Sequence, residues 1–117
     1  FKAHLSQDAI DRMNRAASHF IGTHDFRAYM AEGSKVTTTV RTVLSAGVMR
    51  EGNHVVFHVE ADGFLYNMVR IMTGTLLLVA EGKLSPDDIP RITESLDRRF
   101  TGATAPAEGL YLYRVRY

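Results

Sequence analysis

The sequence predicts an α+β fold, an antiparallel β-sheet with helices packed on one face. Two stretches with period-two alternation are joined by a short turn, which indicates a β-hairpin. Apolar residues recur at helical spacing on both sides of that hairpin. Short hairpin connections favour an antiparallel sheet, and amphipathic helices must bury their apolar side against it.

The first element is a helix that follows Ser6, a residue suited to an N-cap, and ends at Gly22. The next segment, 23–30, is expected to be a short helical turn or a loop with aromatic anchors, and 31–34 a turn. The apolar positions of the helix share one face: Ile10, Met13, Ala17, Phe20 and Ile21.

Strand patterning begins at Val36 and continues to Leu44, followed by a turn at 51–53 and a return strand from His54 to Ala61. In the first strand one face carries Val36, Thr38, Val40, Thr42 and Leu44. In the return strand one face carries Val55, Phe57, Val59 and Ala61.

A long helix is expected from about Phe64, with Asp62 as its N-cap, and it closes at 81–83. A short helix starts at 85–88 with a cap residue, a proline and two acids, and Pro90 keeps it short or kinked. Ile89, Ile92 and Leu96 supply its apolar face. A loop over 98–109 then leads to a last strand, 110–117, in which the alternation slips near Tyr113, as at a β-bulge or on a relaxed edge strand.

Composition places limits on the function. The chain has 117 residues, 45% hydrophobic and 23% charged, which suits one compact domain with its own core. The absence of cysteine excludes disulfides and thiolate metal sites and favours a cytoplasmic protein. No apolar run is long enough to cross a membrane, no signal peptide is apparent, and the start at Phe1 suggests a fragment or a processed product. Of the 14 basic residues 11 are arginine, although the net charge is only +1.

Arg70 is the most informative residue, because it sits in the middle of an almost entirely apolar helix. A guanidinium stays charged and carries five donors, so burying it without a partner is very costly. Its helical neighbours Tyr66, Asn67, Thr73 and Gly74 form a polar stripe that is suited to facing a cleft. Gly74 costs the helix about 1 kcal/mol relative to alanine. Such a glycine is tolerated where a backbone or a ligand approaches closely. Spacing alone leaves two partners open: an external anion, or an in-domain carboxylate such as Asp25 or Asp62.

Other candidate sites carry weaker signals. His54 and His58 lie about 13 Å apart on a strand, too far to share a metal ion. The run 97–100 can grip a phosphate and stack on a base, or it can satisfy the last carbonyls of a helix. Lys35 and Arg41 can line a basic sheet surface. No nucleophile triad, phosphate-binding loop or dinucleotide fingerprint is present.

Several motifs occur together in a characteristic order. Gly-Thr-His-Asp-Phe stands at 22–26, Arg-Thr-Val at 41–43, and the helix motif Gly-Phe-Leu-Tyr-Asn-Met-Val-Arg-Ile-Met-Thr-Gly-Thr-Leu at 63–76. Ala-Pro-Ala-Glu-Gly-Leu-Tyr-Leu follows at 105–112 and Val-Arg-Tyr at 115–117. Over essentially its whole length the chain, 1–117, resembles the C-terminal domain of bacterial tRNA pseudouridine synthase A, the TruA family.

The resemblance implies an isomerase that converts uridine to pseudouridine in the anticodon stem-loop of tRNA, acts as a homodimer and needs no metal or organic cofactor. The family's catalytic aspartate lies in an Arg-Thr-Asp-x-Gly motif of an N-terminal domain, and here Arg41-Thr42 is followed by Val43 instead. The isolated chain is therefore expected to be inactive. By resemblance Arg70 pairs with that aspartate, and the candidates for the walls of the uridine pocket are Phe64, Tyr66, Asn67, Ala105 and Pro106.

The sequence leaves two rival interpretations open. The chain can be a free-standing RNA-binding or dimerisation module without catalysis, or a small ligand-binding α+β domain unrelated to RNA. An Arg-Thr-Asp-x-Gly motif upstream of Phe1 would support the enzyme, and salt-dependent binding to tRNA would argue against the second rival.

Overall fold

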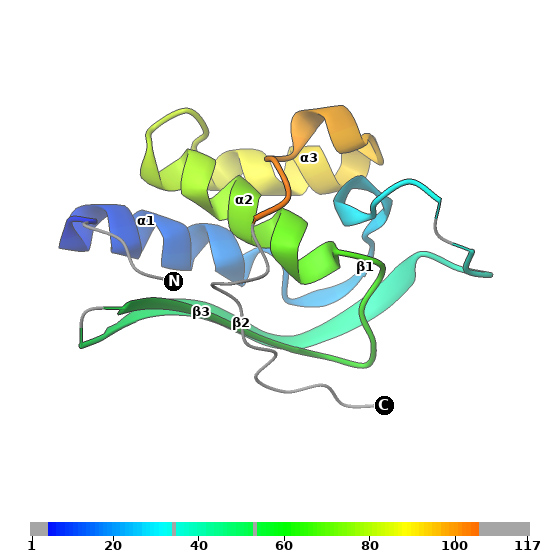
Figure 1. Ribbon diagram of the computed structural model, residues 1–117, viewed down its shortest axis with the longest axis horizontal. Helices are drawn as coiled ribbons and strands as arrows, with labels where there is room; N and C mark the ends of the chain where they lie inside the picture. Colours follow the sequence, from blue (N-terminus) through cyan, green and yellow to red (C-terminus); the bar gives the residue numbers. More distant parts are fainter. Residues whose placement is uncertain (1–4, 34, 53, 106–117) are drawn as a thin grey trace.

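A computed structural model describes residues 5–33, 35–52 and 54–105 of the chain. In this part a three-stranded antiparallel sheet is packed on one side by three α-helices, so the predicted α+β class is confirmed (Figure 1). The predicted last strand and its slip near Tyr113 lie outside the described residues. The elements are α1 (Gln7–Ser18), β1 (Gly22–Asp25), η1 (Arg27–Tyr29), β2 (Val40–Glu51), β3 (His54–Ala61), α2 (Met68–Ala80), η2 (Pro86–Asp88), α3 (Ile89–Ser95) and η3 (Arg98–Phe100).

The first helix forms as its cap predicts. The Ser6 hydroxyl accepts a hydrogen bond from the Ala9 N–H at 3.1 Å, which satisfies one of the free donors at the start of α1. Met13 and Phe20 are fully buried, whereas Ile21 is 44% exposed because the helix has already ended at Ser18. The predicted apolar face is therefore correct except at Ile21.

The segment 23–30 was predicted as a turn or loop, and this was only partly right. Residues Gly22–Asp25 form the edge strand β1, antiparallel to β2, and a 3-10 turn follows. A four-residue strand is too short to show period-two alternation, which explains why the sequence pattern did not reveal it. Its side chains still take part in the sheet, since the Thr23 and Thr42 hydroxyls lie 2.8 Å apart across the strands.

The hairpin of β2 and β3 matches the prediction closely at its turn and in β3. Glu51 pairs with His54 across the turn, and Val55, Val59 and Ala61 are buried beneath the helices. The start of β2 was predicted four residues too early, because Thr38 forms a local turn instead of a strand. Its hydroxyl accepts the Val40 N–H, and its carbonyl accepts from the Arg41 guanidinium. The register of the pair shifts between Val43 and Ser45.

The long helix begins later than predicted. Its first residue is Met68, and Asn67, not Asp62, stands at the N-cap position with a left-handed backbone at φ 59°. Asp62 lies directly after β3 and its side chain binds the sheet instead, because it accepts the Thr42 N–H of β2 at 2.9 Å. The C-terminal end agrees with the prediction: Gly82 has φ 79°, and the Lys83 N–H donates to the Leu78 carbonyl at 2.9 Å.

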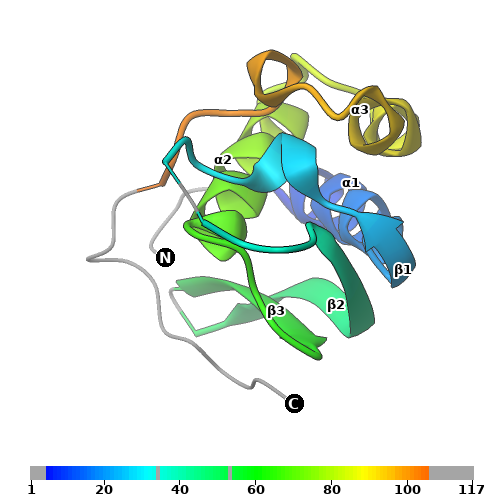
Figure 2. The same ribbon diagram turned by 90° about the vertical axis from the view of Figure 1, so that its right-hand side faces the viewer.

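The elements η2 and α3 also start as predicted, whereas η3 is a 3-10 turn at the start of the segment predicted as a loop. Ser85 and Asp88 form a capping box around η2, which leads directly into α3. Ile89 and Ile92 are buried, but Leu96 is 43% exposed because it lies beyond the end of α3 with φ 56°. Figure 2 shows α1, α2 and α3 together on one side of the sheet, with their shared core between them. No helix in the described ranges is long and apolar enough to span a membrane.

Candidate active-site arginine and its surroundings

Arg70 lies in the first turn of α2 and is half-buried rather than fully buried. Its Nε donates to the Ala105 carbonyl at 2.7 Å, and its Nη1 donates to Oδ1 of Asn67 at 3.3 Å. Both acceptors are neutral. Within the described residues, the guanidinium is thus held on two sides without its charge being compensated.

The predicted alternative of an in-domain carboxylate partner is wrong for both candidates. Asp25 accepts the Thr39 hydroxyl at 2.5 Å and the Arg27 N–H at 3.1 Å, and Asp62 accepts the Thr42 N–H. Within residues 5–33, 35–52 and 54–105, no ion pair joins Arg70 to an aspartate or glutamate. Two of its five N–H groups have acceptors there, and the remaining three, two of them on Nη2, have none among these residues.

The Ala105 carbonyl reaches Arg70 because the chain crosses directly over α2. A Cβ placed on Gly74 would lie 1.7 Å from the Ala103 carbonyl oxygen, and one on Gly102 would lie 2.4 Å from the Gly74 carbonyl. The Gly102 N–H donates to the Thr75 hydroxyl at 2.9 Å, and the Ala105 N–H donates to the Arg70 carbonyl at 3.1 Å. We call residues 101–105 the crossing segment.

The crossing segment explains why residue 74 is a glycine. It also shows that part of the predicted polar stripe was wrong. The close approach predicted for this glycine is made by the chain's own backbone. Thr73 is 1% exposed and donates to the Val69 carbonyl, so the C-terminal half of the stripe does not face a cleft. The N-terminal half, Tyr66, Asn67 and Arg70, retains solvent access.

The other candidate residues have different surroundings. Tyr66 is 61% exposed, whereas Phe64 is half-buried and packs against the core. Ala105 is buried and contacts Arg70 through its backbone, while Pro106 lies outside the described residues. Thr75 and Thr101 were not singled out from the sequence, yet they fasten the crossing segment, since the Thr101 hydroxyl donates to the Ala28 carbonyl at 3.2 Å.

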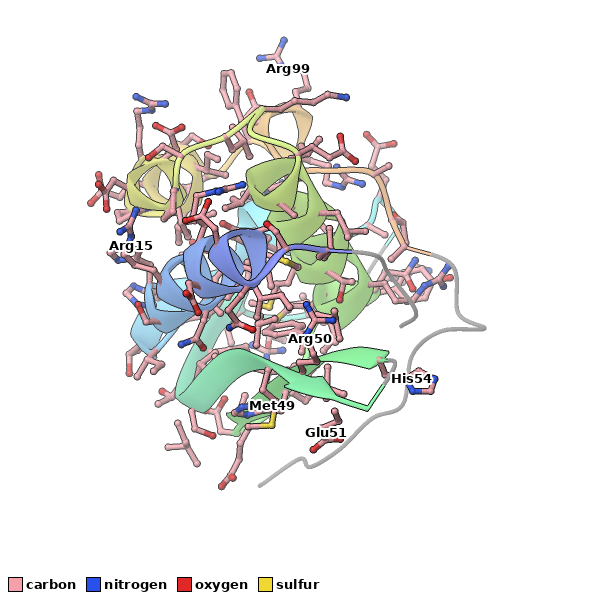
Figure 3. All side chains as sticks on the ribbon, turned by 90° about the vertical axis from the view of Figure 1, so that its left-hand side faces the viewer. Arg15, Met49, Arg50, Glu51, His54 and Arg99 are labelled. Atoms are coloured by element: carbon pink, nitrogen blue, oxygen red, sulfur yellow. The ribbon has the colours of Figure 1, made fainter. Side chains whose placement is uncertain are left out.

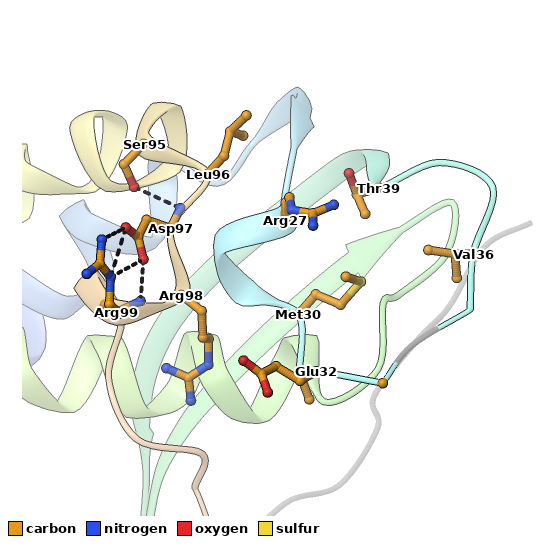
Figure 4. Close-up of a pocket in the computed structure, with 12 residues that line it drawn as sticks. Arg27, Met30, Glu32, Val36, Thr39, Ser95, Leu96, Asp97, Arg98 and Arg99 are labelled. Atoms are coloured by element: carbon orange, nitrogen blue, oxygen red, sulfur yellow. Dashed lines mark hydrogen bonds and ion pairs between the residues drawn. The ribbon is translucent and has the colours of Figure 1, made fainter.

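An open pocket of about 630 Å³ lies between the 27–39 region and the corner that joins α3 to η3 (Figure 4). Arg99 on its wall pairs with Asp97 through Nε and Nη2, at distances of 2.7–3.1 Å. These hydrogen bonds from the Arg99 side chain and backbone lower the pKa of Asp97 to about 2, and the carboxylate raises the pKa of Arg99.

The two roles predicted for the run 97–100 can be compared with these contacts. Arg98 donates to the hydroxyls of Thr101 and Thr104, at 2.8 and 3.3 Å. In the described residues, neither Arg98 nor Arg99 donates a side-chain hydrogen bond to a carbonyl at the end of α3. Phe100 is 56% exposed, which leaves its ring open to stacking.

The histidines of the described residues do not build a metal site. His54 lies at the end of the hairpin, beside Glu51, and points away from the body of the protein (Figure 3). In the portion of the chain that the structure describes, no three His, Asp or Glu side chains are grouped as a metal site would require. Arg41 donates to the carbonyls of Thr38 and Val40.

Comparison with known proteins identifies the kind of protein. The family model described as tRNA pseudouridine synthase matches residues 16–117. tRNA pseudouridine synthase A of Acetivibrio thermocellus is 53% identical over 107 residues, covering 92% of this chain and 44% of the relative. The enzymes of the same name from Geotalea uraniireducens and Clostridium acetobutylicum are 48% and 47% identical, again over 92% of this chain and 44% of each relative.

These matches place the chain in a single protein family. The chain belongs to the tRNA pseudouridine synthase family. It spans less than half the length of the curated relatives it matches.

Proposed function

We propose that this chain is the C-terminal domain of a tRNA pseudouridine synthase that isomerises uridine to pseudouridine in the anticodon stem-loop. In this proposal Arg70 pairs with a catalytic aspartate carried by an N-terminal domain. The observation that supports it is the state of Arg70, which is half-buried, held by two neutral acceptors and unpaired with any carboxylate in the described part of the chain.

Such an arginine would assist the proposed chemistry. Pseudouridine formation breaks the glycosidic bond, turns the base and rejoins it to the ribose through carbon. An aspartate that begins this reaction must be ionised, whether it acts as nucleophile or as base. A guanidinium within hydrogen-bonding distance lowers the pKa of the aspartate and orients its oxygens, and the effect is larger where water is partly excluded.

The surroundings of Arg70 suit a base that has left its stack. The target uridine has to be extruded before its glycosidic bond can be reached. Tyr66 presents an exposed ring close in sequence to Arg70, and Ala105 carries the chain past the guanidinium. Phe64, Asn67 and Pro106 complete the proposed wall. The full-length protein is proposed to be a cytoplasmic homodimer that works on tRNA without a metal or organic cofactor.

Tritium release from tRNA labelled at C5 of uridine tests the proposal. The full-length enzyme should release tritium, whereas the 117-residue chain alone should remain at background because it lacks the aspartate. Turnover by the chain alone would contradict the proposed division of the active site. If the open reading frame contains no Arg-Thr-Asp-x-Gly motif upstream of Phe1, the non-catalytic RNA-binding or dimerisation module becomes the better interpretation.

A further inference from the structure

Asn67 has an unusual backbone for its place in the fold. It stands immediately before α2 with φ 59° and ψ 13°, whereas a residue at this position is ordinarily extended and caps the helix with its side chain. The Asn67 side chain makes no such cap. Its carbonyl accepts the Ile71 N–H at 2.9 Å, and its Oδ1 accepts from Arg70. The side-chain amide therefore serves the arginine and not the helix.

The comparison with Leu96 shows that this conformation needs a reason. Among the described residues, Asn67 and Leu96 are the non-glycine residues with positive φ. Leu96 follows the end of α3, where a left-handed residue is common. Asn67 begins a helix, and the left-handed region is disfavoured for most side chains but tolerated by asparagine.

We infer that Asn67 is a positioning residue for the proposed reaction. With the Ala105 carbonyl on Nε and the Asn67 amide oxygen on Nη1, the plane of the Arg70 guanidinium is fixed at two points. Nη2 has no acceptor among the described residues, and in this inference it receives the carboxylate. This inference rests on the proposed function, because orienting Arg70 matters for turnover only if Arg70 meets the catalytic aspartate.

The neutrality of Asn67 is part of the role. An aspartate at this position would also tolerate the left-handed backbone, but it would place a negative charge three residues from Arg70 on the same helical turn. The guanidinium would then be paired within its own domain, and its effect on the pKa of the catalytic aspartate would weaken. Asparagine orients the arginine without neutralising it.

The variants Asn67→Gly and Asn67→Asp of the full-length enzyme separate these effects. Both preserve the left-handed backbone, and Leu96→Gly is the matched control for adding a glycine at such a position. Asn67→Gly should lower kcat about tenfold, the typical loss of a hydrogen bond to a charged group, with tRNA affinity unchanged. Asn67→Asp should lower kcat further and shift the acidic limb of the kcat–pH profile to higher pH. Leu96→Gly should leave both quantities at the wild-type value.

A double-mutant cycle with Arg70 tests whether Asn67 acts through the arginine. Single-turnover rates with excess enzyme keep slow variants measurable. If Asn67 positions Arg70, Asn67→Gly should have little further effect in an Arg70→Lys background. An equal loss in both backgrounds, or wild-type kcat in Asn67→Gly, would overturn the inference. Wild-type turnover of Arg70→Ala would instead overturn the proposed function and this inference together.

Discussion

Arg70 and Arg99 are both held by neighbouring residues, but in opposite ways. Arg99 is exposed and donates from Nε and Nη2 to the carboxylate of Asp97, so its charge is matched at the surface. Arg70 is half-buried and donates to a backbone carbonyl and a side-chain amide, and among the described residues no carboxylate matches its charge. Arg99 is a satisfied ion pair, whereas Arg70 is proposed to pair with a group outside the described residues.

The difference shows how a protein can make one arginine available among several. Neutral acceptors fix a guanidinium without satisfying its charge, and partial burial strengthens its attraction for an anion. A carboxylate neighbour has the reverse effect, and an exposed pair of this kind contributes little to stability. The type of acceptor is therefore a better guide to function than the presence of hydrogen bonds.

The largest expected effect comes from removing the unmatched arginine. Arg70→Ala in the full-length enzyme should lower kcat by about 10²–10³-fold, because the carboxylate loses its electrostatic partner. Arg70→Lys should also be slow, since an ammonium cannot reproduce the guanidinium fork. Tritium release measures turnover, and filter binding should show nearly unchanged tRNA affinity. A parallel loss of affinity would assign Arg70 to substrate binding instead.

The next effect concerns the crossing segment. Gly74→Ala should destabilise the protein by about 1–3 kcal/mol, because the added methyl group overlaps the Ala103 carbonyl. Helix propensity alone predicts a gain of about 1 kcal/mol, so the two explanations differ in sign. Denaturant unfolding of the enzyme measures the change. The displaced Ala105 carbonyl should also lower kcat, and a stabilised variant with normal turnover would refute the role given to the crossing.

The smallest expected effect on turnover comes from the matched arginine. Arg99→Ala should leave kcat close to the wild-type value, but it should return the pKa of Asp97 from about 2 toward its ordinary value of about 3.9. Because the folded-state pKa is depressed, the stabilisation from this carboxylate is present above about pH 4 and is lost as the pH falls toward 2. NMR titration of the Asp97 carboxyl carbon reads the pKa directly. An unchanged titration midpoint would show that Arg99 is not its main perturbant.

Local signals were sufficient for much of the fold. The Ser6 cap, the hairpin turn and β3 follow from neighbouring residues alone, and the predictions there agree with the structure. The start of α2 was misjudged because apolar residues continue through an irregular segment before Asn67. Asp62 looks like a helix cap in sequence, but its acceptor is used by β2. Tertiary contacts decided both outcomes.

The candidate site was predictable in its residue but not in its contacts. An arginine in an apolar helix and a costly glycine one turn later both point to this helix. The acceptor on Nε, however, is a backbone carbonyl 35 residues away in sequence, and any residue type supplies such a group. No pattern of side chains in the sequence can therefore predict this acceptor. The partner of the Thr75 hydroxyl is likewise a backbone group, the N–H of Gly102, and a side-chain pattern does not predict it.

The crossing of α2 by residues 101–105 also determines which substitutions the surroundings of Arg70 tolerate. Ala105 touches the arginine directly, yet it does so through its carbonyl, so its side chain is not part of the hydrogen bond. Gly74 and Gly102 make no hydrogen bond to the guanidinium in the described structure. At either position, however, an added methyl group would overlap backbone atoms, so the backbone would have to move. Sequence variation among working enzymes should therefore be freer at the residue in contact with Arg70 than at the two glycines behind it.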